Sequence, residues 1–368
     1  MKIPFINLKK QYLEERKNLL NIIDKTIYSG EWVGGSQINL FEKKISKLCN
    51  TKYCVSLNSG TDALTLALYL LGVRKGDEVI TPPNSFIAST AVIVHLGAKP
   101  IFVDVKDDQN IDENKIEEKI TKRTKVIMPV HLTGRMCNMD KITKIAKKYK
   151  IAVVEDSAQS IMSSYIGKQS GAWGDIGCFS AHPLKNLNAI GDGGYLTTNN
   201  KKIYQKIKDL STHGMQDNRN NVKNFGYVSR MDNLQASILN FRLKNLRNLV
   251  KIRRKNVDLY LENLNLKKIY FPKEKKQEFN TYHTFVIQVE KRDKLKKFLK
   301  LKGIDTAIHY PIPIHLQIAS KSLGYSKGSF PITEKQSNKI LSLPINQYMT
   351  KSEILYICKQ INFFTHNI

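Results

Sequence analysis

The sequence lacks the features that mark membrane, disulfide-stabilised and nucleotide-hydrolysing proteins. No apolar run approaches the length that crosses a bilayer, and residues 1–10 contain no apolar core long enough for a signal peptide. Only five cysteines occur in 368 residues, and none forms a Cys-x-x-Cys pair. Their odd number argues against a disulfide framework, so we expect reduced thiols in a cytoplasmic protein. No Gly-x-Gly-x-x-Gly follows the first predicted strand, which argues against a nicotinamide oxidoreductase.

Acidic residues are scarce relative to basic ones. The chain has 59 Lys and Arg against 32 Asp and Glu, a formal net charge of +27. Such an excess favours nucleic-acid or membrane-surface binding when it is concentrated in one patch. Here the lysines are spread along the whole chain, without a long basic tail or an aromatic-interleaved RNA motif. We interpret the excess as compositional drift that would help to attract a diphosphate-bearing substrate. A non-catalytic basic binding protein remains an alternative.

Predicted strands and helices alternate over the first two thirds of the chain, which is typical of a doubly wound α/β fold. The predicted strands there are residues 53–57, 77–81, 100–105, 126–130, 151–155 and 195–198. The predicted helices are residues 8–27, 62–71, 87–96, 111–120 and 139–149, with a long helix from 231 to about 261. A strand at 284–289 and helices at 293–301, 333–340 and 352–361 predict a small α+β domain. We therefore expect a large domain over 1–245 and a small one over 246–368.

A single lysine, Lys185, lies in a short connection between two predicted strands. Phe179 and Ser180 end the first strand, and the glycine-rich turn 191–194 precedes the second. The residues that flank Lys185 are largely apolar, and burial disfavours the ammonium form of lysine. A partly neutral amine is what a lysine needs to react with a carbonyl group.

An acidic pair, Glu155 and Asp156, follows four apolar residues of the preceding predicted strand. Because side chains alternate along a strand, only one of the two can point into a site at its carboxyl end. A carboxylate there could keep the ring nitrogen of pyridoxal phosphate protonated. An ordinary helix cap at Asp156 is the alternative.

A turn of small residues, 58–61, leads from a predicted strand into a helix. The exposed N–H groups and the dipole of a helix start favour an anion, which would lie at Gly60 and Thr61. The turn lacks the Gly-Lys-Ser/Thr ending of a P-loop, which argues against nucleotide hydrolysis. An ordinary Ser/Thr cap remains the alternative reading.

These motifs, in this order over nearly the whole chain, resemble the sugar aminotransferase family of pyridoxal-phosphate enzymes, the DegT/DnrJ/StrS group. The resemblance is carried by 58–64, 155–159, Phe179-Ser180, Lys185-Asn186, 191–194, 229–232, Gln235-Ala236 and 309–311. It implies a type I transferase fold, with a three-layer large domain around a mostly parallel sheet and a smaller α+β C-terminal domain.

The resemblance also implies a role for each candidate site residue. Lys185 and Asp156 would be catalytic, with Lys185 holding the cofactor covalently and Asp156 on its ring nitrogen. The other cofactor contacts would be Gly60, Thr61 and Ser180 on the phosphate, Phe86 stacked on the ring and Gln159 on the ring oxygen. His182, His309 and Tyr310 would contact the sugar. No metal is expected.

The implied reaction transfers an amino group, probably from L-glutamate, to a keto sugar. A nucleotide-linked 3- or 4-keto-6-deoxyhexose, used for surface polysaccharide such as lipopolysaccharide, is the main expectation. A free eight-carbon keto-sugar acid is an open alternative, whereas a sugar dehydratase would carry His in place of Lys185. The family implies a homodimer with a shared active site. Many relatives have Asn where this chain has Val228, which cannot donate a hydrogen bond to a partner's cofactor; Asn224, Ser229 or Arg230 would have to substitute.

Overall fold

The main sheet of the computed structural model, which describes residues 2–215 and 220–367, has seven strands. Their order is β1-β9-β8-β5-β4-β2-β3, and β9 alone among these described strands runs in the opposite direction to the other six. The strands are β1 (Tyr53–Leu57), β2 (Glu78–Thr81), β3 (Lys99–Phe102), β4 (Thr124–Ile127), β5 (Ala152–Asp156), β8 (Ile176–Ser180) and β9 (Gly194–Thr198). The predicted α/β fold with a mostly parallel sheet is confirmed.

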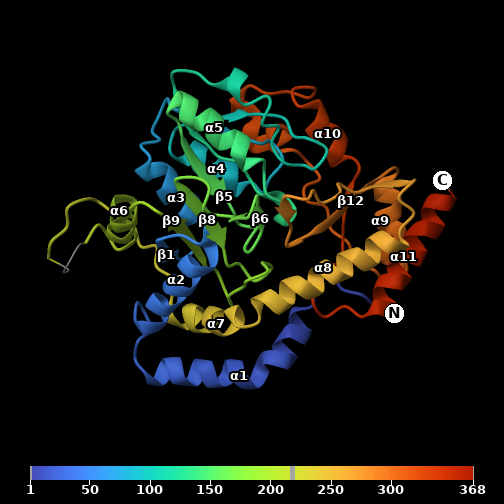
Figure 1. The fold of residues 1–368 in the computed structure, drawn as a ribbon, viewed down its shortest axis with the longest axis horizontal. Helices are drawn as coiled ribbons and strands as arrows, with labels where there is room; N and C mark the ends of the chain where they lie inside the picture. The colour runs from blue at the N-terminus through green and yellow to red at the C-terminus, as the bar shows by residue number, and fades with distance from the viewer. Residues whose placement is uncertain (1, 216–219, 368) are drawn as a thin grey trace.

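Helices cover both faces of this sheet (Figure 1). Val153 and Val154 of β5 show why: both are buried, but they belong to different apolar cores on opposite faces. Helices α3, α4 and α6 pack on one face, and α2, α5 and α7 on the other. The helices of this part are α1 (Leu8–Tyr28), α2 (Ser36–Cys49), α3 (Gly60–Leu70), α4 (Ala88–His95), α5 (Met139–Tyr149), α6 (Lys201–Ser211) and α7 (Asn233–Leu243). The result is the three-layer arrangement that the family resemblance implies.

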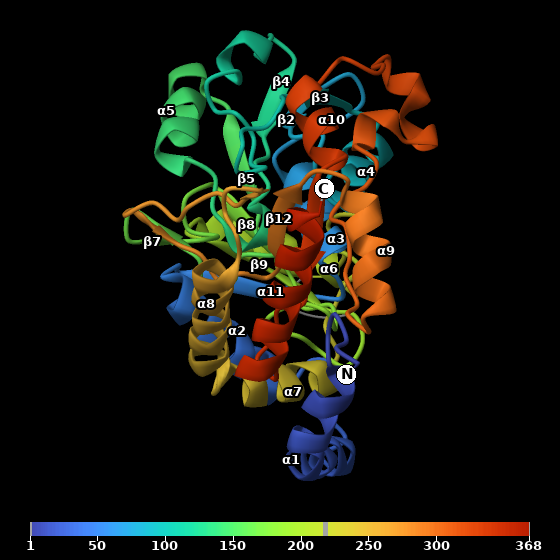
Figure 2. The same cartoon turned by 90° about the vertical axis from the view of Figure 1, so that its right-hand side faces the viewer.

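The C-terminal part is built on a small antiparallel sheet, β10-β12-β13 (Figure 2). Its elements are α8 (Leu246–Asn263), β10 (Ile269–Tyr270), β12 (Phe285–Val289), α9 (Arg292–Leu301), β13 (Ile340–Leu343) and α11 (Lys351–His366). They share one core, which also takes in Ile3 from the start of the chain. Ile314 and Phe330, in contrast, pack on Phe102 of the main sheet. The division at residue 245 stays a prediction.

A short three-stranded sheet, β11-β6-β7, lies beside the main one. Its strands are β6 (Ser164–Tyr165), β7 (Lys168–Gln169) and β11 (Glu278–Phe279). Short 3₁₀ turns occur at η2 (Leu132–Gly134), η3 (Ile314–Leu316) and η4 (Ile318–Leu323). In the described ranges, no helix is both long enough and apolar enough to cross a membrane. All five cysteines are buried and unpaired.

The predicted helix at 111–120 is wrong: only a 3₁₀ turn, η1 (Glu117–Lys119), forms there. Ile111 instead pairs with Val105 in an isolated bridge. Asp112 Oδ1 accepts the N–H of Asn114 at 3.0 Å, and such a local side-chain bond competes with a helical turn. The apolar residues of this segment are brought into the core by a series of turns instead of by one face of a helix.

Two other predicted helices have different bounds. The long helix predicted from 231 to 261 is two helices, α7 and α8, with a turn at Lys244 and Asn245 between them. The break lets α8 begin in the core of the large part and end in the C-terminal core. The predicted helix at 333–340 is shifted to α10 (Pro331–Ser337), since Ile340 pairs with Gln288 as the start of β13.

Candidate active site

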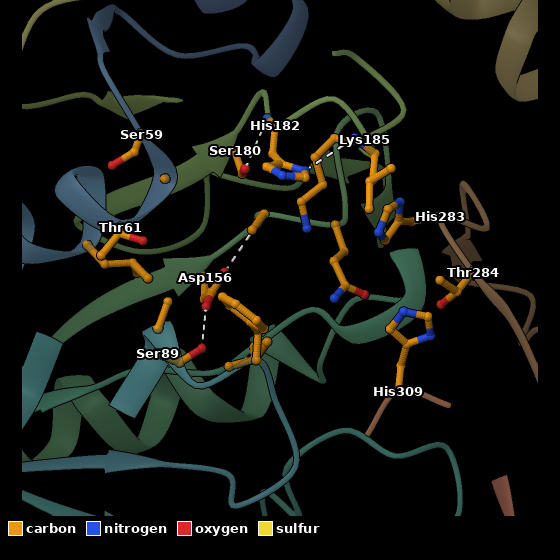
Figure 3. Close-up of a pocket in the computed structure, with 18 of the residues that line it drawn as sticks. Ser59, Thr61, Ser89, Asp156, Ser180, His182, Lys185, His283, Thr284 and His309 are labelled. Carbon is orange, nitrogen blue, oxygen red and sulfur yellow. Dashed lines mark hydrogen bonds between the residues drawn. The ribbon is translucent and has the colours of Figure 1, made fainter. Parts of the chain in front are cut away.

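A cavity of about 360 Å³ lies where the carboxyl ends of the main-sheet strands face the C-terminal part. Every site residue predicted from the sequence lines it: Gly60, Thr61, Phe86, Asp156, Gln159, Ser180, His182, Lys185, His309 and Tyr310. Figure 3 shows Lys185 and Asp156 pointing into this space from different elements. The size is within the range of small-molecule pockets in proteins. Residues far apart in the chain are therefore brought together at the sheet edge where ligands bind in open α/β sheets.

Asp156 is the member of the acidic pair that faces the cavity. Its Oδ2 accepts the hydroxyl proton of Ser89 at 2.7 Å, and its Oδ1 accepts the N–H of Ala158 at 3.2 Å (Figure 3). The carboxylate is buried, and only 5% of the surface of Asp156 is exposed. A charge held this way costs free energy unless it is paired, so it is prepared to receive a cationic or hydrogen-bond-donating partner.

Glu155 points away from the cavity and forms hydrogen bonds to the neighbouring loop at 171–174. Its carboxylate accepts N–H groups of Gly171, Trp173 and Gly174 at 2.7 to 3.0 Å. His131 Nε2 lies 3.0 Å from the same carboxylate, while His131 Nδ1 accepts the N–H of Cys137. An accepting Nδ1 leaves the ring proton on Nε2, which then donates to Glu155. His131, whose role the sequence left open, is thus a buried structural residue outside the cavity.

The start of α3 and the end of β8 meet in one wall of the cavity. Ser59 caps α3 by accepting the N–H of Asp62 at 3.0 Å, and helix geometry leaves the amides of Gly60 and Thr61 without an intrahelical acceptor. A Cβ on Gly60 would lie 2.8 Å from Cβ of Ser180. Glycine therefore lets the free amides and the Ser180 hydroxyl lie together, which suits an anion such as phosphate.

Gly194 is a glycine of this wall whose replacement we expect to be costly. A Cβ there would overlap the backbone of Ser59 and Gly60, whereas one on the adjacent Gly193 would meet Cβ of Ala181 at 3.3 Å. We expect Gly194→Ala to lower the free energy of unfolding by about 3 kcal/mol or more, and Gly193→Ala by about 1 kcal/mol. Urea unfolding of both variants measures this. Equal losses would show that the close approach of β9 to α3 is not needed.

The connection that carries Lys185 is tied to the protein at several points. Its two ends are joined by N–H of Ala181 donating to Gly193 O and by N–H of Ala189 donating to Ala181 O, both at 2.7 Å. Gln235 of α7 makes two hydrogen bonds to the backbone of Ile190, at 2.7 and 2.9 Å. The loop therefore has little freedom.

The cavity favours neutral forms of its basic groups. Burial lowers the pKa of Lys185 to about 8, while the nearby Asp156 carboxylate acts in the opposite direction. Burial, followed by the charge of Lys185, lowers the pKa of His309 to about 4. The same two causes, with neighbouring cations, lower the pKa of His283 well below its usual value. Near neutral pH both histidines are uncharged, and Lys185 is partly so.

The remaining predicted residues line the outer part of the cavity. Gln159 is fixed by accepting the N–H of Thr133 at 2.7 Å. The rings of Phe86 and Tyr310 lie 6.0 Å apart, and Phe86 is 57% exposed. His309 Nδ1 lies 2.8 Å from Ser342 Oγ, and His182 Nδ1 accepts the N–H of Leu184.

Sequence reasoning missed three residues that the structure adds to the site: Ser89, His283 and Thr284. Ser89 is the partner of Asp156, and His283 and Thr284 enter from the start of β12 (Figure 3). His283 Nδ1 and Thr284 Oγ1 are buried and have no hydrogen-bond partner. The Tyr-His-Thr segment before a predicted strand was the only available signal, and by itself it looks like an ordinary strand start.

Comparison with known proteins gives the family. The model of the DegT/DnrJ/EryC1/StrS aminotransferase family matches residues 13–362. The chain belongs to this family. It is 38% identical to the dTDP-3-amino-3,6-dideoxy-alpha-D-galactopyranose transaminase of Aneurinibacillus thermoaerophilus, over 98% of this chain and 99% of that protein.

Solved structures agree with this assignment. DesV of S. venezuelae superposes with a TM-score of 0.97 at 33% identity, covering 100% of this chain and 99% of the other. NtdA of Bacillus subtilis, solved with its cofactor PMP bound, superposes with a TM-score of 0.91 at 33% identity, covering 100% and 86%. The expected family, fold and cofactor are confirmed, and the enzyme is a pyridoxal-phosphate-dependent aminotransferase.

The residues present fit this cofactor on structural grounds. The cavity offers an amine of lowered pKa at Lys185, a buried carboxylate at Asp156 and an anion cradle at Gly60, Thr61 and Ser180. These groups match an aldehyde, a ring nitrogen and a phosphate, respectively.

Proposed function

We propose that this aminotransferase moves an amino group from L-glutamate to a nucleotide-linked 3- or 4-keto-6-deoxyhexose. The observation that carries the proposal is the convergence of Lys185 and Asp156 on one cavity beside an anion cradle. The relative from A. thermoaerophilus, named for a dTDP-linked 3-amino sugar, supports a nucleotide-linked substrate and makes the 3-keto sugar the first to test.

Pyridoxal phosphate, when bound, supplies an electron sink for the carbon that loses its proton. The residues of this chain are proposed to hold the cofactor and to move the proton. Gly60, Thr61 and Ser180 hold the phosphate, and Asp156 keeps a proton on the ring nitrogen. Lys185 Nζ would hold the cofactor and, once released, would move a proton between the α-carbon of the amino donor and the aldehyde carbon of the cofactor, for which a pKa of about 8 is well suited.

Phe86 and Gln159 are proposed to position the cofactor ring. Phe86 presents a largely exposed ring to the cavity, and Gln159 is already fixed by Thr133. His182, His309 and Tyr310 are proposed to contact the sugar. A neutral His309 is a hydrogen-bonding group without charge, which suits sugar hydroxyls.

We also propose that two copies of the enzyme associate. Large apolar side chains are exposed on two segments, Tyr28 to Val33 and Phe225 to Val228. An isolated β-bridge between Val33 and Asp232 connects the chain near these two segments. Such a patch is typical of a protein interface. Val228 is 55% exposed in it, and the hydroxyl of Ser229 donates to Asn58 of its own chain. We propose that Arg230 or Asn224 replaces the missing Asn across the interface. A cytoplasmic location and a role in surface glycan synthesis, such as lipopolysaccharide, complete the proposal.

Cofactor uptake by the apoprotein is expected to depend on pH through Lys185. Only the neutral amine reacts, and with a pKa of about 8 roughly a tenth of it is neutral at pH 7, against about one in three thousand for an ordinary lysine. The uptake rate should therefore rise about tenfold from pH 6 to 7 and level off above about pH 9. Stopped-flow absorbance measures it. A rate still rising at pH 10 would show an unperturbed lysine.

The substrate is tested by incubating the holoenzyme with L-glutamate and defined keto sugars. We expect 2-oxoglutarate and an amino sugar only with a nucleotide-linked 3- or 4-keto-6-deoxyhexose, detected by mass spectrometry. Amination of a free eight-carbon keto-sugar acid instead would replace the proposed substrate class. Loss of water without amination would indicate a dehydratase.

A further inference from the structure

The segment before α1 forms part of the wall of the cavity that contains Lys185. Phe5 and Ile6 both line this cavity. Both residues are partly exposed, so each keeps apolar surface that a bound molecule can cover. The phosphate cradle, the contacts to the cofactor ring and the three proposed sugar contacts include neither of them. Apolar side chains that line a small-molecule pocket usually contact the bound molecule.

Anchors on both sides fix this segment against the protein. The backbone of Ile3 makes two hydrogen bonds, as donor to Gly303 O at 2.8 Å and as acceptor from the N–H of Asp305 at 2.9 Å. Ile3 is also buried in the core of the C-terminal part. On the other side, the side chain of Asn7 caps α1. Phe5 lies between these anchors, so its ring is held at the cavity and is not carried on a free chain end.

The ring of Phe5 continues an aromatic wall that reaches the proposed cofactor site. Phe5 stacks on His309 with ring centroids 5.8 Å apart, and the rings of His309 and Tyr310 are 5.3 Å apart. Tyr310 in turn lies 6.0 Å from Phe86, again between ring centroids. Burial, followed by the charge of Lys185, lowers the pKa of His309 to about 4, so this ring is uncharged near neutral pH. The wall is therefore an uncharged surface with Phe86 at one end and Phe5 at the other.

The order of the rings indicates which part of a bound sugar reaches Phe5. Phe86 is proposed to position the cofactor ring, and the carbonyl carbon that receives the amino group must lie close to the cofactor. The far side of the sugar then lies along the wall toward Phe5. C6 of a 3- or 4-keto hexose is attached outside the sugar ring, only a few bonds from the carbonyl carbon. A group on C6 can therefore reach the end of the wall that Phe5 and Ile6 form.

The chemistry of this end favours a methyl group. Moving a methyl group from water onto the apolar surface of Phe5 and Ile6 is favourable. A hydroxyl group at the same place loses hydration, and neither side chain can donate or accept a hydrogen bond in return. The cost of placing a carboxylate there is larger still.

We propose that Phe5, together with Ile6, recognises the C6 methyl group of the sugar and thereby makes the enzyme select 6-deoxy sugars over sugars that keep the C6 hydroxyl group. This inference rests on the proposed function and adds to it the residue that sets the choice at C6. Phe5 has no group that takes up a proton or forms a covalent bond, so it acts on specificity and not on amino transfer itself.

The test offers the holoenzyme pairs of nucleotide-linked 3- or 4-keto sugars that differ only at C6, one with a methyl group and one with a hydroxymethyl group. kcat/KM at saturating L-glutamate is measured for each. We expect the wild type to favour the methyl sugar by about 10- to 100-fold, the range that an apolar pocket gives for one added hydroxyl group. Equal kcat/KM within the pair would overturn this inference and leave the proposed function standing. Amination of no member of any pair would overturn the proposed function, and this inference with it.

Variants at Phe5 show whether this residue makes the choice. Phe5→Ala is expected to reduce the preference for the methyl sugar by about tenfold, mainly by raising its KM, because the contact is the same before and during the reaction. Phe5→Leu loses the stacking on His309 but keeps an apolar surface, and should keep most of the preference. Phe363→Ala, the matched control, removes the same atoms from an exposed ring on α11 outside the cavity and should behave like the wild type.

The ratio of the two kcat/KM values separates recognition from a structural role. If Phe5 only supported the fold, Phe5→Ala would lower kcat/KM for both sugars alike and leave the ratio unchanged, which would overturn the proposal. So would a Phe5→Leu variant that loses the preference as fully as Phe5→Ala, since the stack on His309 would then matter and the apolar surface would not.

Discussion

Replacing Lys185 with alanine is expected to reduce kcat by more than about 10³-fold, because proton transfer by a placed side chain alone contributes up to about 10⁴-fold. The amine is the only lysine nitrogen lining the described cavity, and its pKa of about 8 allows it to act near neutral pH. No other group there combines basicity with the ability to bind a carbonyl carbon. Steady-state assays with glutamate measure the loss.

Two controls separate this effect from unfolding. The Lys185→Arg variant keeps the length and the positive charge but is not neutral at usable pH, so it should be as inactive as Lys185→Ala. Lys185→Ala should unfold near the wild-type temperature, because removing a buried amine relieves a desolvation cost. A well-folded Lys185→Ala enzyme with a tenth or more of wild-type kcat would defeat the proposed role.

Replacing Asp156 with asparagine is expected to lower kcat by about 10² to 10³-fold, the size seen when one preorganised electrostatic contact is removed. An amide has nearly the same shape and can still accept from Ser89, so the packing is preserved. What is lost is the negative charge in a buried position, which Glu155 does not replace because it points to the other face. Steady-state kcat of the cofactor-saturated variant measures this loss.

Glu155→Gln on the same strand is the matched control. This change also removes one negative charge, at the position next to Asp156. That charge, however, belongs to a carboxylate that binds loop N–H groups and His131 instead of facing the cavity. We expect its thermal unfolding temperature to fall while kcat of the folded fraction changes little. If Glu155→Gln lost as much kcat as Asp156→Asn, the two carboxylates would not be divided between catalysis and structure.

The candidate site residues could be proposed from the sequence because they lie in short local patterns, and the structure brings them to one cavity. Asp156 ends a run of apolar residues, and Lys185 is followed by a glycine-rich turn, so each can be placed at a strand end without knowing the fold. The sequence alone did not decide which of Glu155 and Asp156 faces the cavity, since alternation gives opposite directions but not the direction of each. Hydrogen bonds to Ser89 and to the 171–174 loop supply that answer.

Residues that act through long-range contacts were not predictable. Ser89 lies in an unremarkable helix, and only the packing of α4 against β5 brings its hydroxyl to Asp156, 67 residues away. His283 lies 98 positions from Lys185, so its place beside the lysine depends on how the C-terminal part docks. The helix break at Asn245 likewise follows from burial at both ends of α8 in different cores.

The central claim is that Lys185 holds pyridoxal phosphate in a form that accepts an amino group from glutamate. The visible absorbance spectrum of the purified enzyme, before and after glutamate is added, tests it most directly. The account predicts a yellow protein whose visible band disappears with glutamate in the wild type and is absent in Lys185→Ala. A protein that stays colourless when pyridoxal phosphate is supplied, or a band that glutamate leaves unchanged, would contradict it.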